Sequence, residues 1–234
     1  MTTTLRNAAY ALGLASLLCF WGSTEGQARN QKSTSTKVDT FVVLIPRHAI
    51  EDIEKNIVQM TGLRATAKLR LDRAKDEVRA LENLLDERQK DLDALEAHLD
   101  SLDSDRDAHP IVDLKKKISL LEKFKDLLEL RKEVREAEVQ SAEAAIAYTQ
   151  AQEEFYEGEV ILAKKTLQRD AIAKKQGSAA EVATMDVDIK RLEEELLELW
   201  EKALKRQDGS VSEEQDFLDM LKKLGEAQES FHTP

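Results

Sequence analysis

The chain has 234 residues, of which 35% are charged and only 5% are aromatic, and its formal net charge is −11 at pH 7. So little aromatic mass excludes a thick globular core, and the dominance of alanine, glutamate, lysine, leucine and arginine is typical of long helices. Acidic residues spread along the chain argue against nucleic acid as a partner, because nucleic acid requires a concentrated basic surface.

The first 28 residues have the pattern of an export signal. Arg6 gives a positive start, an apolar run follows over residues 8–21, and 26–28 offers a small-residue cleavage site. The run is shorter than the roughly 17–25 residues of a membrane span. We therefore predict a signal peptide over 1–28 and an exported protein, periplasmic or secreted. An uncleaved anchor is the alternative, and it or a partner would be the only membrane contact.

Residues 29–46 precede the helices as a flexible leader and an extended segment. The stretch 38–45 (VDTFVVLI) is apolar and β-branched and stops at Pro46, a composition typical of a strand. We find no second convincing strand in the sequence that could pair with it. We expect the segment to lie extended along the helices, and a strand added to a partner's sheet is the alternative.

A continuous apolar repeat from Ile50 to Leu102 organises the chain. It advances by alternating steps of three and four residues, and only Arg64 and Arg88 interrupt it. Such a repeat keeps one stripe of side chains toward a partner helix, so we predict a coiled-coil helix that continues through Gly62. The predicted stripe is Ile50, Ile53, Ile57, Met60, Arg64, Ala67, Leu71, Ala74, Val78, Leu81, Leu85, Arg88, Leu92, Leu95, Leu99 and Leu102.

The repeat stops at an acidic turn. Asp103, Asp105 and Asp107 crowd together before His109 and Pro110. Their spacing resembles the start of a calcium loop, but the later positions lack the glycine and the bidentate glutamate that such a loop needs. We expect a simple turn that ends one helix, with Pro110 opening the next.

The second long helix is predicted from Ile111 to about Lys175. Its apolar stripe changes step between Leu121 and Leu127, in the manner of a stammer that locally overwinds a coiled coil. The stripe is Ile111, Leu114, Ile118, Leu121, Phe124, Leu127, Leu130, Val134, Ala137, Ser141, Ala144, Tyr148, Ala151, Phe155, Gly158 and Leu162.

The turn is short enough to make the two long helices antiparallel neighbours, with Ile50 opposite about Lys164 and Val78 opposite about Glu136. The stripe is rich in leucine and isoleucine near the turn and in small residues away from it. Small residues make room for further helices, so we expect the remaining helices to pack at the end away from the turn.

Two shorter helices are predicted over 177–230. Ser178 and Glu181 form a capping box that opens the third helix, and 208–210 (Asp-Gly-Ser) ends it. A short fourth helix would then carry Phe217, and Trp200 on the third helix would pack against that residue or its neighbour one turn on, Leu221. A partner contact is the alternative for the tryptophan.

These elements define an all-α fold: a long antiparallel coiled-coil hairpin over 47–176 with a three- to four-helix base. The four histidines share no metal-ligand spacing, and the sequence contains neither a glycine-rich phosphate loop nor a nucleophile–base set. We therefore predict no catalytic, cofactor or metal site and no enzymatic activity.

One segment resembles a known family. Residues 135–203 combine an Ala/Glu-rich helix, a Gly-Ser break, the restart Ser178-Ala179-Ala180-Glu181-Val182 and another heptad helix. They resemble the α-helical hairpins of periplasmic adaptor (membrane fusion) proteins and of outer-membrane efflux ducts. This resemblance implies a role in an envelope-spanning assembly, without catalysis.

The sequence thus predicts an exported, non-enzymatic scaffold or interaction protein of the cell envelope. The alternative is a periplasmic chaperone-like protein that binds clients. The expected partner is an envelope protein, and a homo-oligomer is left open. The predicted partner-binding residues are Asp103, Asp105, Asp107, His109 and Trp200.

Overall fold

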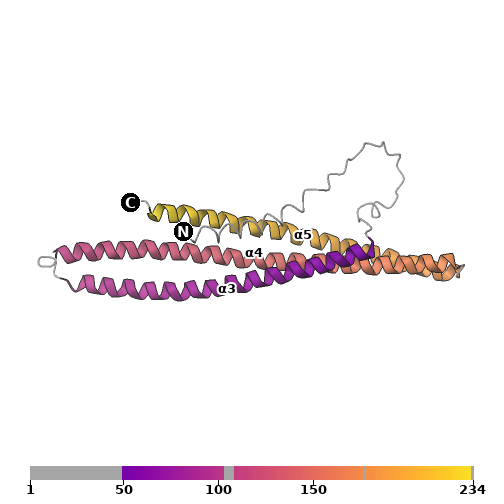
Figure 1. Cartoon of the computed structure of the whole chain (residues 1–234), viewed down its shortest axis with the longest axis horizontal. Coiled ribbons are helices and arrows are strands. Elements are labelled where there is room, and N and C mark those ends of the chain that lie inside the picture. Colours follow the sequence, from indigo (N-terminus) through magenta and orange to yellow (C-terminus); the bar gives the residue numbers. More distant parts are fainter. Residues whose placement is uncertain (1–48, 103–107, 176–177, 233–234) are drawn as a thin grey trace, which may run out of the picture. The chain divides into compact units, whose positions relative to one another are not determined.

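The computed structural model describes residues 49–102, 108–175 and 178–232. The described residues form three α-helices: α3 (Ile50–Asp100), α4 (Ala108–Lys174) and α5 (Ala179–His232) (Figure 1). The predicted all-α class is therefore confirmed. The signal peptide, the leader and the extended segment lie outside the described residues.

α3 is a single helix of 51 residues that continues through Gly62. It begins directly after Ala49, whose backbone is extended, and at its other end the Ser101 hydroxyl donates to the His98 carbonyl at 2.6 Å. Every residue of the stripe predicted on α3 is buried or half-buried. The most enclosed of them are Ile53, Ala74, Leu81 and Leu92.

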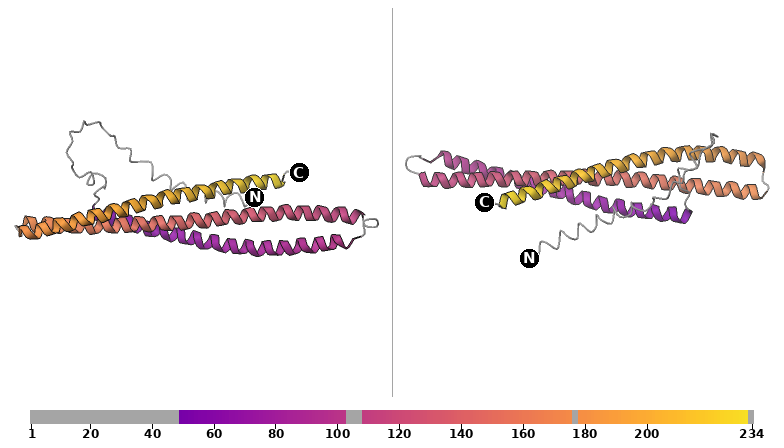
Figure 2. Two further views of the ribbon diagram at one scale, coloured as in Figure 1. Left: turned by 180° about the vertical axis from the view of Figure 1, so that it is seen from behind. Right: turned by 90° about the horizontal axis from the view of Figure 1, so that it is seen from above.

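α4 is the central helix of the three. It packs against α3 and against α5, whereas the Cα atoms of α3 and α5 stay more than 8 Å apart (Figures 1 and 2). Ion pairs between α3 and α4 run in antiparallel order, from Glu54–Lys164 at 4.0 Å through Lys75–Glu143 at 2.9 Å to Glu82–Lys132 at 3.1 Å. These pairings are close to the expected Val78–Glu136 juxtaposition.

α4 buries two stripes rather than one. Toward α3 it turns Leu114, Ile118 and Leu128, all buried. Toward α5 it turns a second heptad-spaced set that includes Ser141 and Phe155, also buried. The change of step that suggested a stammer coincides with a change of neighbouring helix, because the first turns of the predicted stripe belong to the α3 side and the later ones to the α5 side. Phe124 is accordingly 36% exposed, while Leu128, absent from the predicted stripe, is 5% exposed. The local overwinding itself stays a prediction.

α5 corrects the prediction of two shorter helices. It is one helix of 54 residues that passes through 208–210 without a break. The Ser178 hydroxyl accepts a hydrogen bond from the Ala180 N–H at 3.2 Å, so the predicted capping residue does cap the helix. Gly209 is exposed, and a Cβ at this position would have nothing within 4 Å. A glycine on the solvent side of a helix lowers its stability without ending it.

The small residues of α4 do admit a further helix. A Cβ on Gly158 would lie 3.0 Å from Leu196 Cδ1 and 3.3 Å from Leu199 Cδ1, both on α5. Ala142 and Ala151 of α4 are almost completely buried. Along the middle of α4, all three helices therefore pack together, with α3 on one side of α4 and α5 on another.

Candidate functional site

The predicted partner-binding residues do not form one site. Asp103, Asp105 and Asp107 lie outside the described residues, and His109 is exposed in the first turn of α4. Trp200 lies against Phe155 of α4, which is 46 positions (155 − 109) from His109 along the same helix. At about 1.5 Å per residue that separation is roughly 70 Å, so His109 and Trp200 are separate places on the molecule.

We expected Trp200 to pack against Phe217 or Leu221, but the structure places its ring against α4. Its ring centroid lies 5.0 Å from that of Phe155 at an interplanar angle of 49°, and Phe155 in turn lies 5.5 Å from Tyr156. The expectation failed because α5 is continuous. The helix carries Phe217 17 positions (217 − 200) beyond Trp200, about 25 Å, so that the two rings cannot meet.

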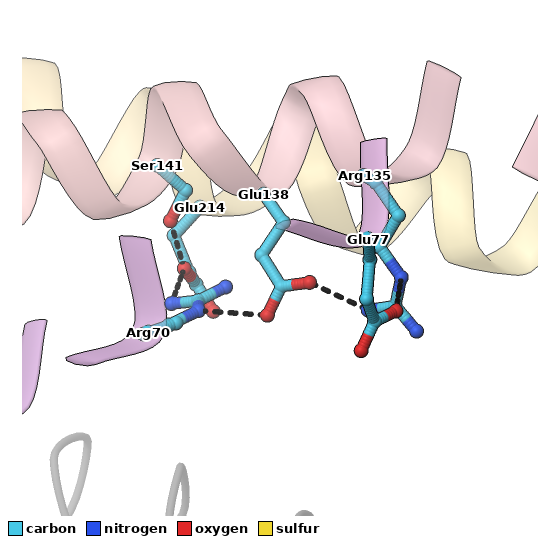
Figure 3. Close-up of polar contacts among 6 residues, drawn as sticks. All are labelled: Arg70, Glu77, Arg135, Glu138, Ser141 and Glu214. Carbon is cyan, nitrogen blue, oxygen red and sulfur yellow. Dashed lines mark hydrogen bonds and ion pairs between the residues drawn. The ribbon is translucent and has the colours of Figure 1, made fainter. Parts of the chain in front are cut away.

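A cluster of polar and charged side chains joins all three helices (Figure 3). We call Arg70, Glu138, Ser141 and Glu214 the polar layer. Arg70 of α3 forms ion pairs with Glu138 of α4 at 3.2 Å and with Glu214 of α5 at 2.8 Å. The Ser141 hydroxyl of α4 donates to the same Glu214 carboxylate. One carboxylate of α5 is thus held by both other helices.

Two neighbouring residues extend the polar layer along α3 and α4. Arg135 of α4 forms an ion pair with Glu138 on its own helix and one with Glu77 of α3 at 2.7 Å (Figure 3). The Arg70 guanidinium also lies over the Phe217 ring, with its central carbon 4.8 Å from the ring centroid. A cation over an aromatic face is attracted by the ring quadrupole, so the ring is part of the same arrangement.

The polar layer is only partly satisfied by its own members. Arg70 Nη2 and Glu214 Oε1 are buried and have no hydrogen-bond partner in the described part of the chain. Incompletely paired charges of this kind contribute little stability, but they penalise any other alignment of the helices.

Sequence reasoning missed the polar layer because the residues just before its α5 member looked like a break between two helices. Between Ala203 and Phe217, steps of four and three lead through Gln207, Ser210 and Glu214, all half-buried. Three polar residues at successive stripe positions made the stripe look finished. The unbroken phase from Ala203 to Phe217 was the signal that could have revealed one helix.

A second set of polar side chains is buried along α4 beside Phe155. Burial raises the pKa of the Tyr148 hydroxyl, the neighbouring Tyr156 adds to this, and a hydrogen bond with Gln152 opposes it. Burial also raises the pKa of Tyr156, followed in size by the charge of Glu159. Both phenols are therefore held in the protonated form.

A third polar contact ties α3 to α4 nearer the start of α3. Glu153 of α4 accepts a hydrogen bond from the Thr61 hydroxyl at 2.8 Å and forms an ion pair with Arg64. Arg64 is one of the two arginines that interrupt the predicted stripe. Its head group is thus used to pair the helices at that point.

These arrangements provide helix-to-helix recognition. Across the three described helices, no group of three or more His, Cys, Asp or Glu side chains is placed to hold a metal ion. None of these helices contains a stretch both long and apolar enough to cross a membrane. Comparisons of the chain with protein-family models, curated proteins and solved structures found no match.

Proposed function

We propose that the protein is an exported, non-enzymatic scaffold of the cell envelope that recognises a protein partner. In this proposal α3 and α4 form an antiparallel coiled-coil hairpin, and α5 thickens the part away from the turn. One observation carries the proposal. α4 holds a helix on each of two faces along its middle but only α3 near the turn, so a thicker stem presents a thinner end.

The thinner end is the part that we assign to partner binding. It carries the turn with Asp103, Asp105 and Asp107, whose carboxylates would meet a basic surface. Such contacts weaken as salt shortens the screening length from about 10 Å at 0.1 M toward 3 Å at 1 M. The resemblance of residues 135–203 to adaptor and efflux-duct hairpins supports a place in an efflux or secretion assembly.

The test is neutralisation of the turn. Replacing Asp103, Asp105 and Asp107 together by Asn should preserve helicity and the melting temperature, because a turn contributes little packing, and it should loosen partner association measured by co-purification from the envelope. The matched control neutralises three exposed carboxylates of α5, and it should leave association unchanged. These control substitutions are Glu194→Gln, Glu198→Gln and Glu201→Gln.

A variant at Trp200 tests the opposite possibility, that the partner binds α5 and not the turn. Because its ring packs on Phe155, the variant to use is Trp200→Phe, which keeps an aromatic ring at that position. Association that survives the triple Asn change but is lost in a folded Trp200→Phe variant would place the working surface on α5 and refute the role of the turn.

The chaperone-like alternative is favoured by a different observation. Val58 and Leu69 of α3 are each 71% exposed, and at eleven residues apart they lie on nearly the same side of the helix. Exposed apolar side chains on a long helix are suited to holding unfolded clients. Envelope pull-downs separate the two functions, because a scaffold should retain one stoichiometric partner and a chaperone a broad set of unfolded chains.

A further inference from the structure

The end of the molecule near the turn carries opposite charges on its two helices. We call residues 91–102, at the end of α3, and 108–125, at the start of α4, the tip. Within the tip, α3 carries four carboxylates and no lysine or arginine, whereas α4 carries five lysines and only two carboxylates, Asp113 and Glu122. The carboxylates of α3 are Asp91, Asp93, Glu96 and Asp100, and the lysines of α4 are Lys115, Lys116, Lys117, Lys123 and Lys125.

Among the described residues, no ion pair joins the two helices within the tip. The α3–α4 ion pair nearest the turn, among the described residues, is Glu82–Lys132. Nearer the turn the described ion pairs connect residues of the same helix, as in Arg88–Asp91 and Lys125–Glu129. The tip therefore presents an acidic helix beside a basic one.

The tip also lacks the third helix. Pairs between α4 and α5 have residue numbers that sum to about 355, as in Arg169–Asp186 and Ser141–Glu214. The last residue of α5, His232, thus lies opposite about residue 123 of α4 (355 − 232), and Figure 1 shows α5 ending before it reaches the first turns of α4. The face that α5 covers further along α4 is left open over about residues 108–122.

Apolar side chains mark that open face. Leu120 lies on that open face and is 61% exposed, and Phe124, 36% exposed, lies at its edge opposite the end of α5. Both continue the heptad spacing of the α5-facing stripe through Leu127 and Val134. Lys116, Lys117 and Lys123 flank them and are exposed. An apolar strip between lysines fits a helix that carries carboxylates.

We propose that a second copy of this chain occupies the open face of the tip. In a dimer of two tips related by a two-fold axis, α4 of each copy would lie along α3 of the other. Each basic helix then meets an acidic one, and Leu120 and Phe124 leave the solvent. The proposal rests on the proposed function, because it names the partner of the tip.

Charge complementarity favours a second copy of this chain, rather than an acidic helix from another protein, as the occupant of the open face. The two-fold arrangement satisfies the acidic and the basic helix together, whereas a single acidic helix would leave the carboxylates of α3 unmatched. Electrostatic contacts of this kind mainly set partner choice and the rate of association, so we expect a salt-sensitive dimer.

Sedimentation of the full chain over a range of concentrations tests the proposal. We expect a dimer at low salt whose dissociation constant rises by at least about tenfold between 0.05 M and 0.5 M salt, as the screening length shortens. Two variants should each be monomeric because neither keeps an acidic tip helix beside a basic one. One is Lys116→Glu with Lys117→Glu, and the other is Glu96→Lys with Asp100→Lys.

Mixing these two variants should restore a dimer of one copy of each. The control pair, Lys190→Glu with Lys205→Glu, makes the same charge change on exposed positions of α5 and should dimerise like the unaltered chain. A chain that stays monomeric at low salt, or a mixture that fails to pair, would overturn the proposal. If the chain is monomeric while the triple Asn variant still loses an envelope partner, the proposed function stands and the second copy is wrong.

Discussion

Single side chains in the polar layer fix how the three helices are aligned. Glu214 of α5 contacts Arg70 of α3 and Ser141 of α4 at once. Sliding α5 by one turn would remove both contacts and leave charged groups buried without partners, which is costly. An apolar residue at the same place would pack almost equally well in several alignments. We therefore attribute the register of α5 to this carboxylate.

The first prediction concerns the two charges of that contact. Arg70 and Glu214 are each only about a quarter exposed (26% and 25%), so removing one leaves the other poorly solvated. Arg70→Met should lower the free energy of unfolding by about 1–2 kcal/mol. Glu214→Gln should cost less, because Arg70 keeps Glu138. Urea denaturation of both single variants and of the double variant measures their coupling.

The control for this pair is Arg79→Met, whose ion pair with Asp76 is fully on the surface. It should change the free energy of unfolding by no more than about 0.5 kcal/mol. Equal losses at Arg70 and Arg79 would show that the polar layer does not bind the helices together.

The second prediction is a loss of stability at high pH. Burial raises the pKa values of Tyr148 and Tyr156 in the folded chain, whereas in the unfolded chain each is near 10. The folded state then binds more protons than the unfolded state above about pH 10, so stability falls as pH rises through the folded pKa values. Urea denaturation on either side of that pH measures the loss.

Tyr148→Phe and Tyr156→Phe should each flatten this decline, because phenylalanine has no proton to lose. Each variant is its own control at neutral pH, where both phenols are protonated in either state. A decline as steep in the two variants as in the unaltered chain would mean that the phenols are not desolvated.

At the scale of the helices, the apolar spacing predicted α3 well because α3 faces a single neighbouring helix. Its continuity through Gly62 and the buried side of the helix both followed from the repeat. α4 was harder, because it faces two helices. Its sequence superposes two stripes, and a search for one stripe read the change from the first to the second as a change of step.

α5 was predicted as two helices because Asp208, Gly209 and Ser210 are common in turns. Tertiary contacts on both sides of these residues override their preference for a turn. Leu196 and Ala203 before them and Phe217 after them are buried. Their composition could not show this, since the deciding contacts come from α3 and α4. The polar layer was hidden for the same reason.

The third prediction tests the continuity of α5. Because a Cβ at Gly209 would have nothing within 4 Å, Gly209→Ala should raise the free energy of unfolding by roughly 0.5–1 kcal/mol, the gain of alanine over glycine inside a helix. In a turn that requires glycine the same change would destabilise. Thermal and urea unfolding distinguish the two signs.

Gly158→Ala is the comparison for this prediction. It should gain the same helix propensity, but its Cβ would press on Leu196 Cδ1 at 3.0 Å, so part or all of the gain should be lost. If Gly209→Ala destabilises the chain, the helix is broken near this residue, as its sequence first indicated.

At the scale of the whole molecule, the described helices are closely packed along the middle of α4 and less enclosed at the tip. Along its middle, α4 is enclosed by two helices, with Gly158, Phe155 and the polar layer closing the contacts. At the tip only two helices remain, no ion pair between described residues joins them there, and Leu120 is exposed. The packing residues are thus concentrated along the middle of α4, and the tip is the part that we propose binds a partner.

Crosslinking from the tip in intact cells tests the central proposal most directly. A photoreactive residue placed at His109, which is exposed at the start of α4, should yield one discrete product, either with a second copy of the chain or with one envelope protein. The same residue at Lys190 of α5 is the control and should yield no product of this kind. Products from Lys190 with none from His109 would contradict the account, because the partner would then lie on α5 and not at the tip.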